Sequence, residues 1–202
     1  MGLGQENRAN CSSGSRRELT EIAINCFARW GFQGSSIDRI ATMAGVSKGA
    51  VYYHFRDKED LLAEAVSDRI REFEARVTGA CKGVDPAGAL RRIAEVCIEH
   101  ARSNDHPRFI ITLMSETIET NETVSAALKA MMRRFRAFLA QLISRGQEQG
   151  LFRNDADPES VAAGYTSAVL GAEIQFYQDP ENFPFELSLD SYLDRLIGDL
   201  RS

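Results

Sequence analysis

The sequence of 202 residues lacks the features that would mark a membrane, secreted or metal-binding protein. No uninterrupted apolar run approaches the roughly 18 residues that a membrane span needs, and the N-terminus has no apolar signal-peptide core. We therefore expect a cytoplasmic protein with no membrane partner. The four cysteines show no Cys-x-x-Cys or Cys/His ligand spacing, which argues against a zinc site or a disulfide framework; they are Cys11, Cys26, Cys81 and Cys97. We favour the interpretation that these cysteines are buried packing residues or have no specific role. A redox-sensing pair of thiols stays open as the alternative.

Catalytic signatures are also missing. A carboxylate enzyme built in a helical bundle needs Glu-x-x-His pairs on facing helices, and the chain has none. Glu99 and His100 are adjacent, so they point to different faces of a helix. No nucleophile elbow, phosphate-binding loop or His-Glu-x-x-His motif occurs. The sequence therefore predicts neither an enzyme nor a bound cofactor or metal.

Charge is unevenly distributed along the chain. The net charge is −5, but residues 1–60 carry eight Lys/Arg against seven Asp/Glu, and residues 61–202 carry sixteen against twenty-two. The acidity therefore lies outside the first 60 residues. Nucleic-acid binding by this chain would have to rest on local geometry rather than on a strongly basic domain.

Helical periodicity runs through the whole chain, and no segment shows the sustained alternation of a strand. We therefore predict an all-α protein of about nine helices. The expected helices are 16–30, 37–44, a short third helix from 48, then 58–78, 87–103, 109–119, 121–149, 159–178 and a last one around 189–200. Residues 1–14 read as a disordered tail, and the helices that follow are divided into a smaller unit at 15–75 and a larger helical core at 76–202.

Three serines at helix starts organise the N-terminal unit. Ser15 and Glu18 form a capping box, and Ser36 gives a second start signal of the same type. Gly45 ends one short helix and Ser47 opens the next. Two short helices joined by a glycine-containing turn are typical of a helix-turn-helix, which we place at about 38–57.

Residues 15–75 resemble the TetR family of bacterial transcriptional regulators. The residues that carry the resemblance are Phe27, Gly31, Ser36, Ile37, Ile40, Ala41, Ala44, Gly45, Val46, Ser47, Lys48, Gly49, Val51, Tyr52, Tyr53, His54, Phe55, Lys58, Leu61 and Leu62. The resemblance implies that the third helix enters the major groove of an operator. The implied DNA contacts are Ser36, Ser47, Lys48, Gly49, Ala50, Tyr52, Tyr53, His54 and Lys58.

Physical chemistry is consistent with these roles. Lys48 can reach a guanine edge or a phosphate, and the small Gly49 and Ala50 keep the helix thin enough to enter the groove. Val51 and Phe55 should instead pack inside the unit. A helix-turn-helix of this type binds two half-sites as a two-fold dimer, so we expect a homodimeric repressor with double-stranded operator DNA as its partner.

The second unit is expected to hold an effector and the dimer surface. Soft and aromatic residues there suit an apolar pocket for an apolar or amphipathic small molecule. The candidate pocket residues are Cys97, His100, Phe109, Leu113, Met114, Met131, Phe135, Phe138, Tyr165, Glu173 and Phe176. The candidate dimer residues are Ala168, Gly171, Ala172, Leu193, Leu196 and Ile197. Ordinary core packing explains the dimer set nearly as well, and for each pocket residue taken separately an ordinary core or surface role is the favoured interpretation. A module that sequesters a ligand without touching DNA is the rival function.

Overall fold

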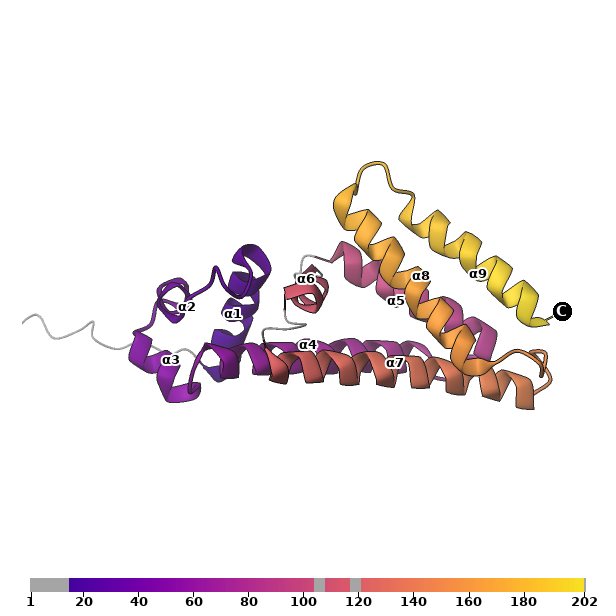
Figure 1. The fold of residues 1–202 in the computed structure, drawn as a ribbon, viewed down its shortest axis with the longest axis horizontal. Helices are drawn as coiled ribbons and strands as arrows, with labels where there is room; N and C mark the ends of the chain where they lie inside the picture. The colour runs from indigo at the N-terminus through magenta and orange to yellow at the C-terminus, as the bar shows by residue number, and fades with distance from the viewer. Residues whose placement is uncertain (1–14, 104–107, 117–120, 202) are drawn as a thin grey trace, which may run out of the picture. The chain divides into compact units, whose positions relative to one another are not determined.

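The computed structural model describes residues 15–103, 108–116 and 121–201, and in these ranges the chain forms helices and no strands (Figure 1). The helices are α1 (Arg16–Trp30), α2 (Ile37–Ala44), α3 (Lys48–His54), α4 (Lys58–Ala80), α5 (Pro86–Arg102), α6 (Arg108–Glu116), α7 (Glu122–Glu148), α8 (Pro158–Gln178) and α9 (Phe185–Arg201). The predicted all-α class is confirmed. The predicted tail at 1–14 and the predicted end of the helix at 117–119 lie outside the described residues.

Serine caps set the starts of the first three helices, as the sequence predicts. The hydroxyls of Ser15, Ser36 and Ser47 each accept a hydrogen bond, at 3.2 Å, from the backbone N–H three residues further on. Gly45 ends α2 in the left-handed conformation, with φ 66° and ψ 25°. A residue with a Cβ would be strained there, so this glycine fixes the turn between α2 and α3.

The N-terminal unit has its own core. Its fully buried members come from all four helices and from the residue that follows α3, and the larger ones include Leu19, Ile24, Phe27, Ile40, Val51, Phe55, Leu61 and Leu62. An ion pair on the surface also links α1 to α4, because the guanidinium of Arg16 donates to both carboxylate oxygens of Glu64 at 2.9 and 2.7 Å. Helices as short as α2 and α3 are marginal alone, so their stability comes from this packing.

The chain divides into two compact units between Val66 and Ser67, within α4. This division falls before the predicted boundary at residue 75, because Phe73 and Val77 join the core of the second unit. The sequence pattern of α4 is amphipathic throughout and so gives no sign of the change of unit.

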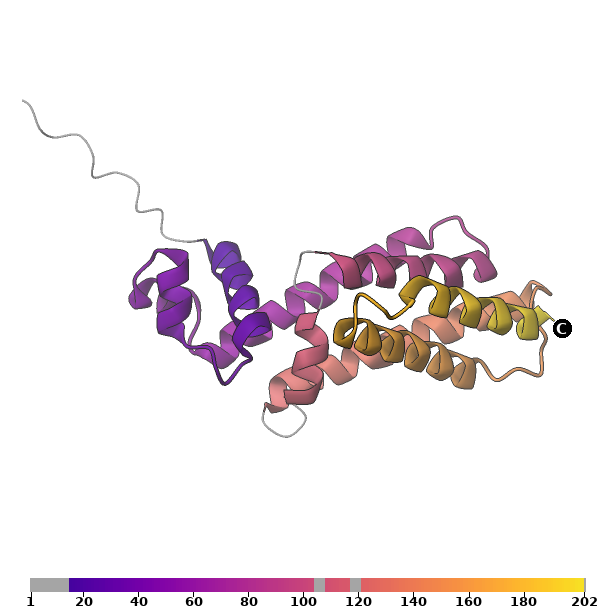
Figure 2. The same cartoon turned by 90° about the horizontal axis from the view of Figure 1, so that it is seen from above.

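In the second unit, α7 packs on α8, α9 packs on α8 and α5, and α5 lies against α7 (Figure 2). Tyr165, buried at the centre, donates its hydroxyl proton to the carbonyl of Leu90 at 2.8 Å. Gly146 in α7 is covered by the ring of Phe152, which leaves no room for a side chain at that position.

Three cysteines fall in the described residues, and all three are free and buried: Cys26, Cys81 and Cys97. Burial raises the pKa of each thiol, most strongly that of Cys97. A raised pKa keeps a thiol in its unreactive protonated form, which favours the structural interpretation of these cysteines. No helix in the described parts of the chain combines the length and apolarity that crossing a membrane requires.

Candidate nucleic-acid interface and ligand cavity

The exposed face of α3 is polar, aromatic and nearly flat. Tyr53 is 85% exposed and Tyr52 is 48% exposed, while the preceding residue, Val51, is fully buried. Ser47 and Gly49 are exposed at the N-terminal end of the same face, where the first backbone N–H groups of a helix attract phosphate. The helix therefore presents hydroxyls and a bare backbone outward and holds its apolar side inward.

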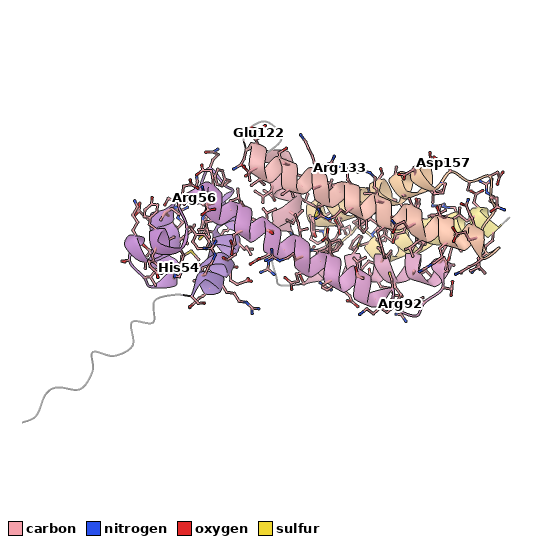
Figure 3. The ribbon with its side chains drawn as sticks, turned by 90° about the horizontal axis from the view of Figure 1, so that it is seen from below. His54, Arg56, Arg92, Glu122, Arg133 and Asp157 are labelled. Atoms are coloured by element: carbon pink, nitrogen blue, oxygen red, sulfur yellow. The ribbon has the colours of Figure 1, made fainter. Side chains whose placement is uncertain are left out.

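The remaining predicted members of this face are less accessible. Ala50 and His54 are half-buried, and the His54 ring packs edge-on against Tyr53 with 5.0 Å between the ring centroids. The carbonyl of His54 accepts a hydrogen bond from Arg16 at 2.5 Å, which ties the C-terminal end of α3 to α1. Figure 3 marks His54 at this end and Arg56 just beyond it.

Lys48 is held by an exposed ion pair rather than left free. Its Nζ lies 2.9 Å from the carboxylate of Asp38 on α2, and this pairing raises the pKa of Lys48. Exposed ion pairs contribute little to stability, so the ammonium can exchange Asp38 for a phosphate or a base edge at small cost. The charge is thus present on the face where the sequence predicts it.

Lys58, a predicted phosphate contact, makes internal contacts in this structure. Its Nζ donates hydrogen bonds to the carbonyls of Phe32 at 2.9 Å and Ser35 at 3.1 Å, and lies 4.0 Å from the centre of the Phe32 ring. The ammonium therefore satisfies backbone oxygens of the turn after α1 and joins that turn to the start of α4. The sequence pattern could not distinguish this internal use from a surface contact.

Arg39 is an exposed cation of α2 that the sequence reasoning missed. Its guanidinium stacks on Trp30 at 4.7 Å from the ring centroid and donates to the carbonyl of Gly34 at 2.7 Å. The sequence contained one sign of this, because Arg39 follows the Ser36 cap by three residues, and that spacing places its positive charge near the N-terminus of α2.

The second unit contains a cavity of about 260 Å³ walled by α4, α5, α6, α7 and α8. Eight predicted pocket residues line it: Cys97, His100, Phe109, Met114, Met131, Phe135, Phe138 and Glu173. Three predicted residues lie elsewhere. Leu113 and Tyr165 are buried in the packing around it, and Phe176 stacks on Phe185 with 4.9 Å between centroids.

A whole wall of the cavity comes from α4, although none of its residues is among the predicted pocket residues. The α4 residues are Arg69, Ile70, Phe73, Glu74, Val77 and Thr78. Met132, another soft side chain that the sequence offers for an apolar pocket, lines the cavity as well. The other lining residues that were missed are Ile110, Ile111, Arg134, Thr166, Val169 and Leu170. The apolar stripe of α4 gave a signal for burial, but nothing in it distinguished a cavity wall from a filled core.

Glu173 is the buried carboxyl of this cavity. It is 8% exposed, and no residue in the described ranges donates a hydrogen bond to it or pairs with its charge. Burial alone raises its pKa from 4.5 to about 8. An apolar cavity with one such carboxyl can hold a ligand and orient it through a single polar contact.

A second hollow of about 440 Å³ adjoins the first along α7 and shares Met114 and Met132 with it. Its rim is basic, formed by Lys129, Arg133 and Arg136. Figure 3 marks Arg133 along α7, between Glu122 at the helix start and the body of the unit. This second hollow therefore combines three cationic side chains with the apolar Met114, Leu128 and Met132.

Half of the predicted dimer residues are internal to one chain. Ala172, Leu193 and Ile197 are buried in the core of the second unit, which leaves them no surface for a partner. Ala168, Gly171 and Leu196 are partly exposed on the outer side of α8 and α9. On the same two helices Ile174 is 47% exposed and Leu187 66% exposed, two apolar side chains that the prediction omitted.

Two family profiles match this chain. The profile described as bacterial regulatory proteins, tetR family, matches residues 19–65, and the one described as tetracyclin repressor-like, C-terminal domain, matches residues 86–171. Together they span the α3 face and most of the cavity.

Curated and structural relatives agree with the profiles. The chain is 28% identical over 151 residues to the transcriptional repressor NicS of Pseudomonas putida, a match that covers 73% of this chain and 70% of NicS. A TetR transcriptional regulator from Chloroflexus aurantiacus superposes with a TM-score of 0.85 at 20% identity, covering 92% of this chain and 96% of that one. AibR in complex with isovaleryl coenzyme A and operator DNA superposes with a TM-score of 0.71 at 24% identity, covering 90% and 97%.

Proposed function

The chain belongs to the TetR family of bacterial transcriptional regulators, and we propose that it is a homodimeric repressor released from a palindromic operator by a small molecule. The observation that carries the DNA-binding part is the exposed face of α3. That face presents the Ser47 cap, Lys48, the bare backbone of Gly49 and two tyrosines, on a helix held by a buried core. Such a surface suits major-groove contact, with side chains for bases and hydroxyls for phosphates.

Dimerisation is supported by the outer side of α8 and α9. Partly exposed small residues and the exposed Ile174 and Leu187 lie on these helices. Apolar surface at exposed positions marks interaction sites, and a two-fold dimer matches the symmetry of a palindromic operator. We expect a partner chain to cover this surface.

Effector control is supported by the cavity and by the residues of α4. Ile70, Phe73 and Val77 of this helix line the cavity, and Leu61 and Leu62 of the same helix are core residues of the DNA-binding unit. A ligand that binds more tightly to one position of the cavity wall therefore stabilises that position of α4. Because both units contain part of α4, the ligand shifts the population of dimers that can bind DNA. The AibR complex, with a ligand and operator DNA, is a precedent on the same fold.

The test starts with selection of bound fragments from genomic DNA of the source bacterium, followed by affinity measurements on the selected site. We expect two chains per site, an affinity at least a thousandfold above that for random DNA, and a fall in affinity as salt rises. A chain that binds selected and random DNA equally, or binds neither, would refute the proposal and favour a module that sequesters a ligand.

A further inference from the structure

The carboxyl group of Glu173 lines the cavity of the second unit and has no hydrogen-bond or ion-pair partner among the described residues. Glu173 is nine-tenths buried and lines the cavity, yet no described residue bonds to it. Folded proteins rarely leave a buried polar group in this state, and an unsatisfied one points to a missing partner such as a ligand. One turn further along α8, the buried hydroxyl of Tyr177 also has no hydrogen-bond partner among the described residues.

The other ionisable groups around the cavity do not compensate Glu173. Arg69 on α4 pairs with Glu72 at 2.6 Å, and Glu74 pairs with Arg134 of α7 at 2.8 Å. On α5, the Cys97 thiol is fully buried, which raises its pKa and keeps it neutral, and on α8 burial does the same for Tyr177. The imidazole of His100 on α5 also lines the wall, where it packs on Phe73. The charged side chains of α4 and α7 that line the cavity are therefore paired, and the carboxyl of Glu173 is left over. The α7 cations Lys129, Arg133 and Arg136 belong to the adjoining hollow and not to this lining.

The wall around this carboxyl is aromatic and soft. The rings of Phe73 and Phe135 are 6.0 Å apart between centroids at an angle of 48°, and the rings of Phe73 and His100 are 5.7 Å apart at 54°. All three rings line the same cavity as Glu173, and the face of an aromatic ring carries negative electrostatic potential. Aromatic faces attract organic cations, above all those with methyl or alkyl groups on nitrogen.

From these observations we propose that the cavity binds an organic ammonium ion, with the carboxylate of Glu173 as its counter-ion and the aromatic side chains around its apolar substituents. This inference rests on the proposed function, because it names the chemical class of the effector. The volume of about 260 Å³ limits the ligand to a small one.

Binding of a cation changes the protonation of Glu173. Burial raises the pKa of the empty site to about 8, so at pH 7 the carboxyl is mostly protonated. A permanent cation binds the ionised form, and the proton leaves to solvent. Its affinity should therefore rise with pH, up to about tenfold per unit below pH 8, and level off above. A neutral ligand that accepts a hydrogen bond from the protonated carboxyl would show the opposite dependence.

The test uses the full chain and two probes of the same shape, benzyltrimethylammonium and its neutral carbon isostere neopentylbenzene. Ligand-detected NMR gives the dissociation constant of each at pH 6, 7 and 8. We expect the cation to bind at least tenfold more tightly than the isostere at pH 8, with a preference that grows with pH. Equal affinities, tighter binding of the isostere, a preference that falls with pH, or no binding of either probe would overturn the inference.

A matched pair of variants locates the effect. Glu173→Gln keeps the shape of the side chain and should abolish both the preference for the cation and its pH dependence. Glu159→Gln is the same change at an exposed position of α8 and should leave both intact. If Glu173→Gln still prefers the cation over its isostere, Glu173 is not the counter-ion. If that variant folds poorly, the pH dependence of cation binding in the wild type still tests the role of Glu173.

Operator release is measured separately, by adding the cation to the chain bound to its selected DNA. A cation that binds but does not release DNA leaves the ammonium site standing and refutes the effector role. A chain that binds its operator but shows no preference for the cation refutes the ammonium site alone.

Discussion

Glu173 makes the stability of the second unit depend on pH in a predictable direction. Burial raises the pKa of its carboxyl from 4.5 to about 8, so the folded state keeps a proton that the unfolded chain releases. The contribution is therefore most favourable below pH 4.5, is lost progressively as pH rises through 8, and is constant above that. A pKa difference of this size corresponds to slightly more than about 1 kcal/mol per pH unit in the free energy of unfolding, and to about 5 kcal/mol in total.

The assay is urea unfolding of the wild type and of Glu173→Gln at pH 5.5, 6.5 and 7.5, because the difference between the two proteins cancels the other titrating groups. We expect the variant to gain stability relative to the wild type by about 1 kcal/mol with each step in pH. Glu159→Gln, exposed on the same helix, should show no such trend. A difference between wild type and Glu173→Gln that does not change with pH would refute the reasoning.

Three further changes test other contacts. Lys58→Ala removes the ammonium group that donates hydrogen bonds to two backbone carbonyls of the turn after α1. This change should destabilise the N-terminal unit by about 1–3 kcal/mol, measured as a lower melting temperature. An unchanged melting temperature would mean that these bonds do not stabilise the unit and would favour the predicted DNA contact. Gly146→Ala forces a methyl group onto the Phe152 ring and should cost about 1–3 kcal/mol in urea unfolding, whereas Gly79→Ala enters open space and should not destabilise; equal effects would contradict the packing. Tyr165→Phe leaves the carbonyl of Leu90 without its side-chain donor and should lower stability by about 1 kcal/mol, and no loss would mean that the bond contributes nothing.

The sequence was most informative where local chemistry determines structure. Serine caps and Gly45 placed the first three helices, since a cap depends only on residues within one turn. The outward Tyr52 and Tyr53 and the inward Val51 agree with the roles that the family resemblance implied for these residues. These predictions needed no knowledge of distant parts of the chain.

Predictions that depended on tertiary packing were less complete. Leu193 and Ile197 form an apolar stripe, and such a stripe is equally suited to the core of one chain, where the structure has them, or to a dimer surface. Lys58 reads as a surface cation until the carbonyls of Phe32 and Ser35 are seen beside it. The α4 wall of the cavity could not be predicted for the same reason, because an apolar helix face does not reveal whether its neighbours fill the space.

The central claim is that the face of α3 contacts operator DNA, and the most direct measurement compares two glycine-to-glutamate variants. Gly49 lies on that face with room for a side chain, and Gly79 near the end of α4 is surrounded by open space. Both variants add one negative charge, so affinity for the selected operator, measured by fluorescence anisotropy at fixed salt, isolates the position of that charge. The account predicts at least a hundredfold loss for Gly49→Glu and little change for Gly79→Glu. Unchanged affinity in Gly49→Glu, or an equal loss in both variants, would contradict it.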